Sequence, residues 1–408
     1  MSVPPGRLVV PRGRSHVDQC VSFFAKIRVW LCAPAIGVRG SRCKPLGRQQ
    51  ETETCPSYAP LFDALRFYTA PLRVVRLRPR FGLPGRMQKV DTYEDFMTDT
   101  MQLIRDLQLN MEQVVLGKTD VIRMCLVALL AGEHVLLEDV PGVGKTLVAK
   151  TLAKSVDGSF NRIQFTPDLL PSDIVGSSIY DDKTREFHFN KGPIFANVVL
   201  ADEINRTPPR TQSALLEAMS DGQVSVDGRT HQLSPPFIVI ATQNPFEFEG
   251  TFPLPESQLD RFLIRISMGY PERDDERAVL MSHREQEPVN SLRPIISCTQ
   301  ILNLQQVVRA VRVEESIYDF VLDIVAATRE SDELRVGVST RGALCLYRSA
   351  QALATVRDRD YVVPDDVKDL AIPVLSHRVM PKGHSHSSSR TAVESIIGRI
   401  VESIRVPV

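Results

Sequence analysis

Lys145 and Thr146 are the residues whose types and spacing most clearly indicate chemistry. They follow a Pro-Gly-Val-Gly turn at 141–144, and two residues separate this turn from the short apolar run 134–138. Glycines leave backbone N–H groups free to face phosphate oxygens, and the N-terminus of a following helix adds partial positive charge. In such a loop the lysine reaches the β- and γ-phosphates, and the threonine hydroxyl binds Mg²⁺. The sequence therefore predicts a phosphate-binding loop between a strand and a helix over 147–152.

The loop departs from the usual pattern at one position. The pattern G-x-x-x-x-G-K-[ST] requires glycine at position 139, where this chain has Asp139. A second Gly-Lys-Thr sequence at 117–119 has no strand or glycine turn before it, so we do not expect it to bind phosphate. The strand and helix that flank 142–146 favour a nucleotide loop there over a loop without nucleotide.

Two adjacent carboxylates, Asp202 and Glu203, end the apolar run 198–201. An acid at the end of a strand beside the phosphate loop is placed to hold Mg²⁺ through water, and a second acid can deprotonate an attacking water. The alternative is that both acids only cap the next helix, although Thr207-Pro208 already supplies a helix start. Asn244, which follows the apolar run 237–241, either holds the attacking water or is a turn residue.

The elements that must position these residues fall into two parts. Strands are predicted at 134–138, 162–165, 198–201, 237–241 and 262–266, with hairpins at 178–189 and 223–233 and helices at 93–109 and 118–130. After Pro271 the pattern is helical, at 301–311, 315–328, 341–355, 364–370 and 390–404. We expect an α/β core over 87–270, with a parallel sheet flanked by helices, and a smaller all-helical domain over 271–408.

Charge is unevenly distributed along the chain. Residues 1–86 carry a net charge of +11 and residues 87–408 a net charge of −11. The first segment has no period of 2 or 3.6 residues. We therefore favour a disordered extension, or upstream sequence translated before a true start at Met87, over a basic nucleic-acid arm or a targeting leader. Its apolar stretch 21–38 is interrupted by charges and proline, and no other stretch is suited to span a membrane.

The cysteines and histidines do not indicate a metal centre. Cys125, Cys298 and Cys345 are isolated in apolar helical contexts, which indicates buried thiols in a reducing compartment, here the cytoplasm. His384 and His386 lie in a Gly- and Ser-rich run without a nearby cysteine or acid, which favours a flexible loop over a metal site.

The phosphate loop, the paired acids, Asn244, Arg261 and Arg341 occur in the order that resembles AAA+ ATPases. Longer strings resemble the MoxR family among them: LLEDVPGVGKT (136–146), IQFTPDLLPSDIVG (163–176), LADEINRTPPRTQSALLEAM (200–219), ATQNPFEFEGTFPLPESQLDRF (241–262) and VSTRGALCL (338–346). The resemblance covers about residues 95–405 and nothing in 1–86. The family often departs from glycine at 139, and it more often has Pro-Arg-Ala where this chain has Thr340-Arg341-Gly342.

The resemblance implies a role for each matched residue. The catalytic set is Glu203 as the base, Asn244 as sensor 1, Arg261 as an arginine finger for a neighbouring subunit and Arg341 as sensor 2 in the lid. Magnesium would be held by Thr146 and, through water, by Asp202. ATP would be bound by Val115, Gly117, Pro141, Gly142, Val143, Gly144, Lys145, Thr146 and Leu147.

The resemblance also implies a function. Members of the family act as ATP-hydrolysing, chaperone-like remodellers that mature other complexes, often with metal insertion. They form rings, typically hexamers, and work with a protein that carries a von Willebrand factor A domain. The two hairpins would face the ring pore or a partner.

The same residues leave three alternative functions to compare with this one. The nearest enzymatic alternative is a magnesium-chelatase-like subunit, whose motifs overlap heavily. A slow nucleotide-dependent binding switch would not need Glu203 as a base. A motor on nucleic acid is disfavoured by the net charge of −11 over 87–408. The client does not follow from the sequence.

Overall fold

The computed structural model describes residues 93–140, 142–244, 250–282, 287–383 and 389–407. These residues belong to one compact unit, Arg86–Val408. The predictions for 1–86, Pro141, His384 and His386 lie outside the described residues. None of the described helices combines the length and apolarity needed to cross a membrane.

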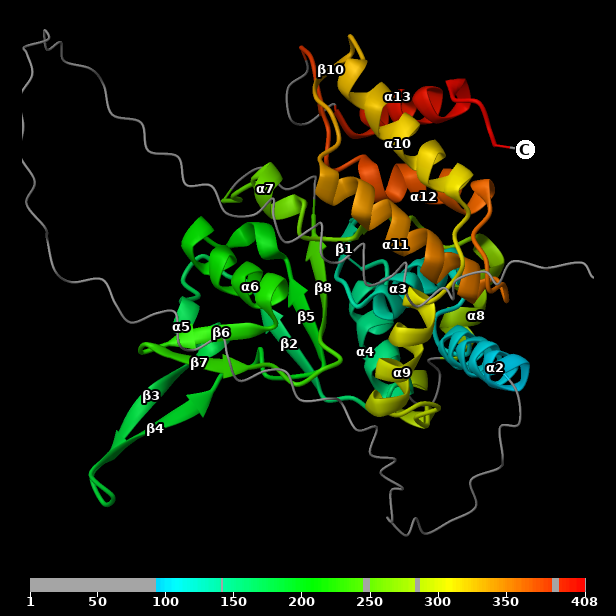
Figure 1. Ribbon diagram of the computed structural model, residues 1–408. Helices are drawn as coiled ribbons and strands as arrows, with labels where there is room; N and C mark the ends of the chain where they lie inside the picture. The colour runs from blue at the N-terminus through cyan, green and yellow to red at the C-terminus, as the bar shows by residue number, and fades with distance from the viewer. Residues whose placement is uncertain (1–92, 141, 245–249, 283–286, 384–388, 408) are drawn as a thin grey trace, which may run out of the picture. The chain divides into compact units, whose positions relative to one another are not determined.

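A five-stranded parallel sheet carries the α/β part of the chain, in the order β2-β5-β8-β1-β9 (Figure 1). Its strands are β1 (Val135–Glu138), β2 (Phe160–Gln164), β5 (Val198–Asp202), β8 (Ile238–Gln243) and β9 (Ile264–Ile266). The strands β1, β5 and β8 are buried along nearly their whole length, as expected for a parallel sheet covered on both faces. Strand β2 lies at the edge, where Arg162 and Gln164 are exposed on either side of buried Ile163.

Helices cover both faces of the sheet and bury two hydrophobic clusters. One cluster contains residues of α2 (Tyr93–Glu112), α3 (Thr119–Ala131) and α4 (Lys145–Ser155), and the other contains residues of α5 (Pro171–Val175) and α6 (Pro209–Asp221). The predicted α/β core with a parallel, helix-flanked sheet is therefore confirmed. Each predicted strand is present, with its ends shifted by one or two residues.

Two hairpins are attached to this core, as the alternating sequences predicted. They are β3 (Gly176–Asp181) with β4 (Glu186–Lys191), and β6 (Gln223–Val226) with β7 (Arg229–Gln232). The β3–β4 hairpin projects away from the sheet and its helices (Figure 1). Near its end the rings of Tyr180 and Phe187 pack together, with centroids 5.2 Å apart, although Phe187 is 68% exposed.

The chain then forms α8 (Arg273–Ser282), the short helix η3 (Pro288–Ser291) and α9 (Cys298–Arg309). The lid helices are α10 (Glu315–Glu330), α11 (Thr340–Val356), α12 (Pro364–Leu375) and α13 (Ser389–Ser403). The prediction of an all-helical lid missed one feature, an antiparallel pair between β10 (Leu334–Val336) and β11 (Met380–Pro381). These strands are too short to show an alternating pattern.

The lid shares its hydrophobic core with α2, α3 and α4 rather than forming a separate one. A buried arginine also joins the lid to the α/β core. Arg378 donates to Asp260 Oδ1 at 3.0 Å and to the carbonyl of Leu263 at 3.1 Å. The domain boundary near residue 270 stays a prediction.

Candidate active site

The phosphate loop lies between β1 and α4, as its sequence predicted. Gly142 and Gly144 have φ angles of 86° and 95°, in the left-handed region that favours glycine. Helix α4 then begins at Lys145, so its N-terminal N–H groups face the loop. The buried Lys145 ammonium donates to the carbonyl of Asp139 at 2.6 Å, which holds the side chain against the loop.

Asp139, the departure from the usual loop pattern, anchors the base of the loop. Its carboxylate accepts hydrogen bonds from the N–H of Val140 at 2.8 Å, from the N–H of Gly269 at 2.5 Å and from the Ser267 hydroxyl at 3.0 Å. Burial alone would raise the pKa of Asp139, but these hydrogen bonds together lower it. Asp139 therefore ties the end of β1 to the segment after β9 as a carboxylate.

The paired acids follow β5 and are fixed by one hydroxyl from the neighbouring strand β8. The fully buried Thr242 hydroxyl donates to Asp202 Oδ1 at 2.6 Å and accepts from the Glu203 N–H at 2.9 Å. Glu203 has φ 59° and ψ 49°, a left-handed conformation that non-glycine residues rarely adopt. Sequence reasoning missed Thr242, which has no signal beyond its place near a strand end.

The edge strand β2 supplies a second set of contacts to the same carboxylates. The Arg162 guanidinium donates to Asp202 Oδ2 at 2.6 and 3.1 Å, and Gln164 Nε2 donates to Glu203 Oε2 at 2.7 Å. Residues two apart on a strand share a face, and β2 pairs directly with β5. The alternation of polar residues over 162–164 could have predicted this placement, but sequence reasoning missed it.

These parts line one cavity of about 530 Å³, a volume suited to a small-molecule ligand. The predicted residues that line it are Gly142, Gly144, Lys145, Thr146, Leu147, Asp202, Glu203 and Asn244. Residues missed from the sequence also line it, namely Lys150, Arg162, Val279 and Glu287. Three cationic side chains therefore face the cavity together with three acids, as binding of both a polyphosphate and a metal ion requires.

The remaining predicted residues do not line this cavity. Pro141 lies outside the described residues. Val143 packs against the hydrophobic core, and Val115 is buried in it. Gly117 lies against Asp275 of α8, so close that a Cβ atom there would meet the carboxylate. Lys118, in the second Gly-Lys-Thr sequence at 117–119, donates to the carbonyls of Met268 and Tyr270 at 2.7 and 2.9 Å and does not join the phosphate loop.

The two predicted catalytic arginines lie elsewhere on the same subunit. Arg261 follows α7 (Glu256–Leu259) and donates to the Leu216 carbonyl and the Ser220 hydroxyl, both on α6. Arg341 lies in the first turn of the lid helix α11, where its Nε is 3.8 Å from Asp260 Oδ2. Their predicted roles at a phosphate stay predictions.

The donor set suits a magnesium ion bound together with a nucleotide. Thr146 and Asp202 line the same cavity, and Mg²⁺ prefers oxygen ligands from one or two carboxylates or hydroxyls plus substrate phosphates. Among the described residues no group of three or more histidines, cysteines or acids could hold a metal by itself.

The sheet order and the parts of this cavity define an AAA+ ATPase, and two family models agree. A model described as ATPase family associated with various cellular activities (AAA) matches residues 134–264, and an AAA lid domain model matches residues 326–397. The protein is therefore an ATPase with an AAA+ core and a helical lid.

Relatives narrow the class further. The chain is 51% identical over 299 residues to the uncharacterized protein YeaC of Bacillus subtilis, covering 73% of this chain and 93% of YeaC. It is 41% identical over 305 residues to Chaperone MoxR1 of Mycobacterium tuberculosis, covering 72% and 80% of the two chains. A crystal structure of a proposed ATPase from Cytophaga hutchinsonii matches with a TM-score of 0.71 and 37% identity, covering 77% of this chain and 98% of that one. The chain belongs to the MoxR family of AAA+ ATPases and has a chaperone-like role.

Proposed function

We propose that this protein uses the hydrolysis of magnesium-bound ATP to mature or activate a protein complex in the cytoplasm. The observation that carries the proposal is that the phosphate loop and the paired acids Asp202 and Glu203 line one cavity. A pure binding switch would need the loop but not a carboxylate positioned to act as a base.

Each residue in the cavity has a distinct task in this proposal. Lys145 neutralises the β- and γ-phosphates, while Thr146 and, through water, Asp202 hold Mg²⁺. When bound, Mg²⁺ supplies positive charge that stabilises the transferring phosphoryl group. Glu203 takes a proton from the attacking water, and Asn244 orients that water. Gln164 donates to Glu203 Oε2 at 2.7 Å and so occupies one of the two carboxylate oxygens that could take this proton.

The remodelling activity would be transmitted through the hairpins. Exposed aromatic side chains such as Phe187 and Tyr180 are disfavoured on a surface that contacts only water and are enriched at protein interfaces. In this proposal the subunits form a ring, a hexamer as is typical of the family, and the hairpins contact a partner with a von Willebrand factor A domain. Metal insertion into the client belongs to the same proposal.

The test is ATP turnover in the presence of that partner. Phosphate release is measured for the wild type, Phe187→Ser and the control Tyr270→Ser, with and without a purified von Willebrand factor A domain protein from the same genome. Tyr270 is 76% exposed, belongs to neither hairpin, and accepts a hydrogen bond at its carbonyl from Lys118, next to α3. We expect the partner to change the wild-type and control rates at least twofold and the Phe187→Ser rate much less.

The rate of ATP turnover by Phe187→Ser without the partner shows whether the substitution has left the active site intact. The proposed class of partner is wrong if two results occur together. The partner leaves the wild-type rate of ATP turnover unchanged, and it forms no complex with ATP-loaded Glu203→Gln protein. If the wild type shows no ATP turnover without the partner, the proposed hydrolysis is contradicted.

A further inference from the structure

A second cavity, of about 300 Å³, lies where the lid meets the sheet. The α/β core contributes Arg265 of β9 and Glu256 of α7 to its lining. The lid contributes Arg335 of β10, Arg390 of α13, and Ser376 and His377, which follow α12. None of these residues lines the nucleotide cavity.

The arginines that line this cavity are only partly paired with carboxylates. Arg265 and Arg390 share one carboxylate, Glu138, at 3.7 and 3.2 Å, and Arg390 also lies 2.9 Å from Glu394. Arg335 donates to the sulfur of Met380 at 3.1 Å, and a thioether is a weak acceptor. The lining contains three arginines and one carboxylate, Glu256, and Arg335 has no carboxylate partner among the described residues, which favours a ligand with negative charge.

Two residues of the lining each carry a buried nitrogen that has no hydrogen-bond partner among the described residues. These nitrogens are Arg265 Nε and His377 Nδ1, and His377 is only 4% exposed. Buried polar atoms in proteins nearly always have a partner, so the unpaired Arg265 N–H, which is a donor, favours a ligand that accepts hydrogen bonds. The Ser376 hydroxyl accepts from Arg265 Nη2 at 3.2 Å and can itself donate into the cavity.

We infer that this cavity binds a small oxyanion, a carboxylate or a phosphate group, that bridges the core and the lid. Arg265 would contact it from the core, and Arg335 and Arg390 from the lid. Guanidinium groups suit this ligand because their planar fork matches the oxygens of both anions. The cavity has the volume of a small-molecule site and is too small for a folded segment of another protein. A bound anion would restrain the lid, which also carries Arg341.

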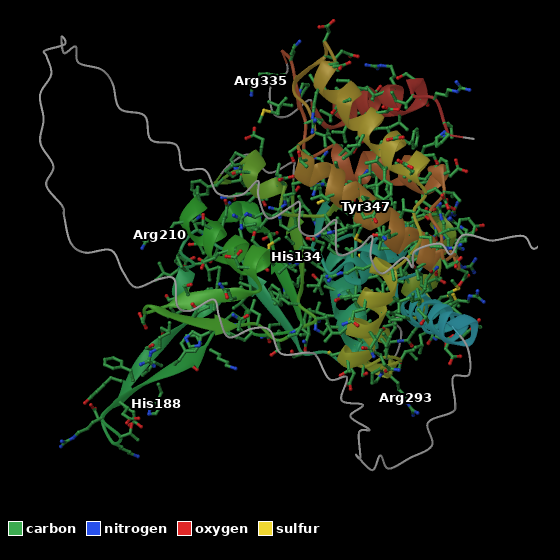
Figure 2. All side chains as sticks on the ribbon, viewed as in Figure 1. His134, His188, Arg210, Arg293, Arg335 and Tyr347 are labelled. Atoms are coloured by element: carbon green, nitrogen blue, oxygen red, sulfur yellow. The ribbon has the colours of Figure 1, made fainter. Side chains whose placement is uncertain are left out.

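Calorimetry with inorganic phosphate and with succinate tests the inference on the full chain. The nucleotide cavity is first saturated with a non-hydrolysable ATP analogue and Mg²⁺, so that its β- and γ-phosphate positions are filled and do not bind the added anion. Arg335→Gln is the main variant, because Arg335 is exposed at the end of the lid and its loss should not impair folding (Figure 2). Arg265→Gln removes the buried contact. Arg312→Gln, whose side chain is 70% exposed and pairs with Asp360, is the matched control.

We expect saturable binding of at least one anion to the wild type and to Arg312→Gln. Arg335→Gln should weaken this binding by about ten-fold or more, since a charge-assisted hydrogen bond is lost. Binding of phosphate alone would identify a phosphate ester as the ligand class, and binding of succinate alone would identify a carboxylate. The inference fails if neither anion binds up to about 10 mM. It also fails if Arg335→Gln binds as tightly as the wild type.

Discussion

At the scale of single residues, the two acids of the active site depend on Thr242. Its hydroxyl contacts Asp202 at 2.6 Å and the backbone of Glu203 at 2.9 Å, so both acids are fixed by one group. The left-handed conformation of Glu203 costs on the order of 1 kcal/mol. It persists because its surroundings hold it, and Thr242 is the contact that reaches both residues.

Replacing Thr242 should therefore separate binding from catalysis. Thr242→Val keeps the shape but removes the hydroxyl, and we expect ATP hydrolysis to fall by roughly 10²-fold because the acids lose their alignment. ATP affinity should change little, and Thr242→Ser should restore most of the rate. Phosphate release and fluorescent-ATP titration measure the two quantities. A valine variant that hydrolyses ATP like the wild type would show that Thr242 does not position the acids.

The sequence predicted the residues with recognisable motifs and missed those that act through geometry. Lys145, Thr146, Asp202 and Glu203 were found because loop and strand-end chemistry is local in sequence. Arg162 and Thr242 were missed because their contacts depend on which strands are neighbours. That order, β2-β5-β8, is set by packing across the whole sheet rather than by any local pattern.

At the scale of elements, His134 joins three parts of the core. Its Nδ1 accepts from the N–H of Val239 at 3.0 Å, on β8, and its Nε2 lies 2.9 Å from the carbonyl of Met219, on α6. The ring immediately precedes β1 and is buried. Because Nδ1 accepts a hydrogen bond, the ring is neutral with its proton on Nε2. Burial lowers the pKa of His134 below its usual value.

This burial predicts a loss of stability in mild acid. The unfolded chain takes up a proton at His134 below about pH 6.5, whereas the folded chain resists it until a lower pH. The stabilising effect is thus present above that pH and is lost as the pH falls, by up to about 1.4 kcal/mol per pH unit. Urea unfolding between about pH 7.5 and 5.5 measures it. The decline should be shallower for His134→Asn, and parallel curves for the two proteins would contradict the assignment.

The elements themselves were largely predictable, for identifiable reasons. The apolar runs of β1, β5 and β8 are continuous because helices cover both faces of the sheet. The dipeptide Asp227-Gly228 is typical of a hairpin turn and predicts the β6–β7 hairpin. In contrast, β10 and β11 pair residues about 45 positions apart over two or three residues each, which leaves no periodic signal.

At the scale of the whole molecule, Asp260 connects the lid to the predicted arginine finger. Arg378 and Arg341 of the lid both contact Asp260, at 3.0 and 3.8 Å, and Asp260 directly precedes Arg261. Movement of the lid would therefore be transmitted through Asp260 to the adjacent residue Arg261. Arg261 does not line the nucleotide cavity, and its role at a neighbouring subunit's phosphate stays a prediction.

A mixing experiment tests this assignment. Arg261→Ala subunits keep their own loop and base but cannot complete a neighbour's site, and Glu203→Gln subunits lack the base but can still donate Arg261. Each variant alone should be nearly inactive, since an arginine finger contributes ~10³-fold or more in rate. Co-assembled rings should recover part of the ATPase activity. If light scattering shows mixed rings that stay inactive, Arg261 does not act across an interface.

The central claim is that one cavity both binds ATP and hydrolyses it through Glu203. The direct measurement is ATP binding and phosphate release by Glu203→Gln, compared with Lys145→Ala and the wild type. Glu203→Gln keeps a hydrogen-bonding side chain but not a base, so we predict near-normal ATP affinity with hydrolysis reduced by roughly 10²-fold or more. Lys145→Ala should instead lose ATP binding while circular dichroism shows an intact fold. Wild-type phosphate release by Glu203→Gln would contradict the claim, because another residue would then have to be the base.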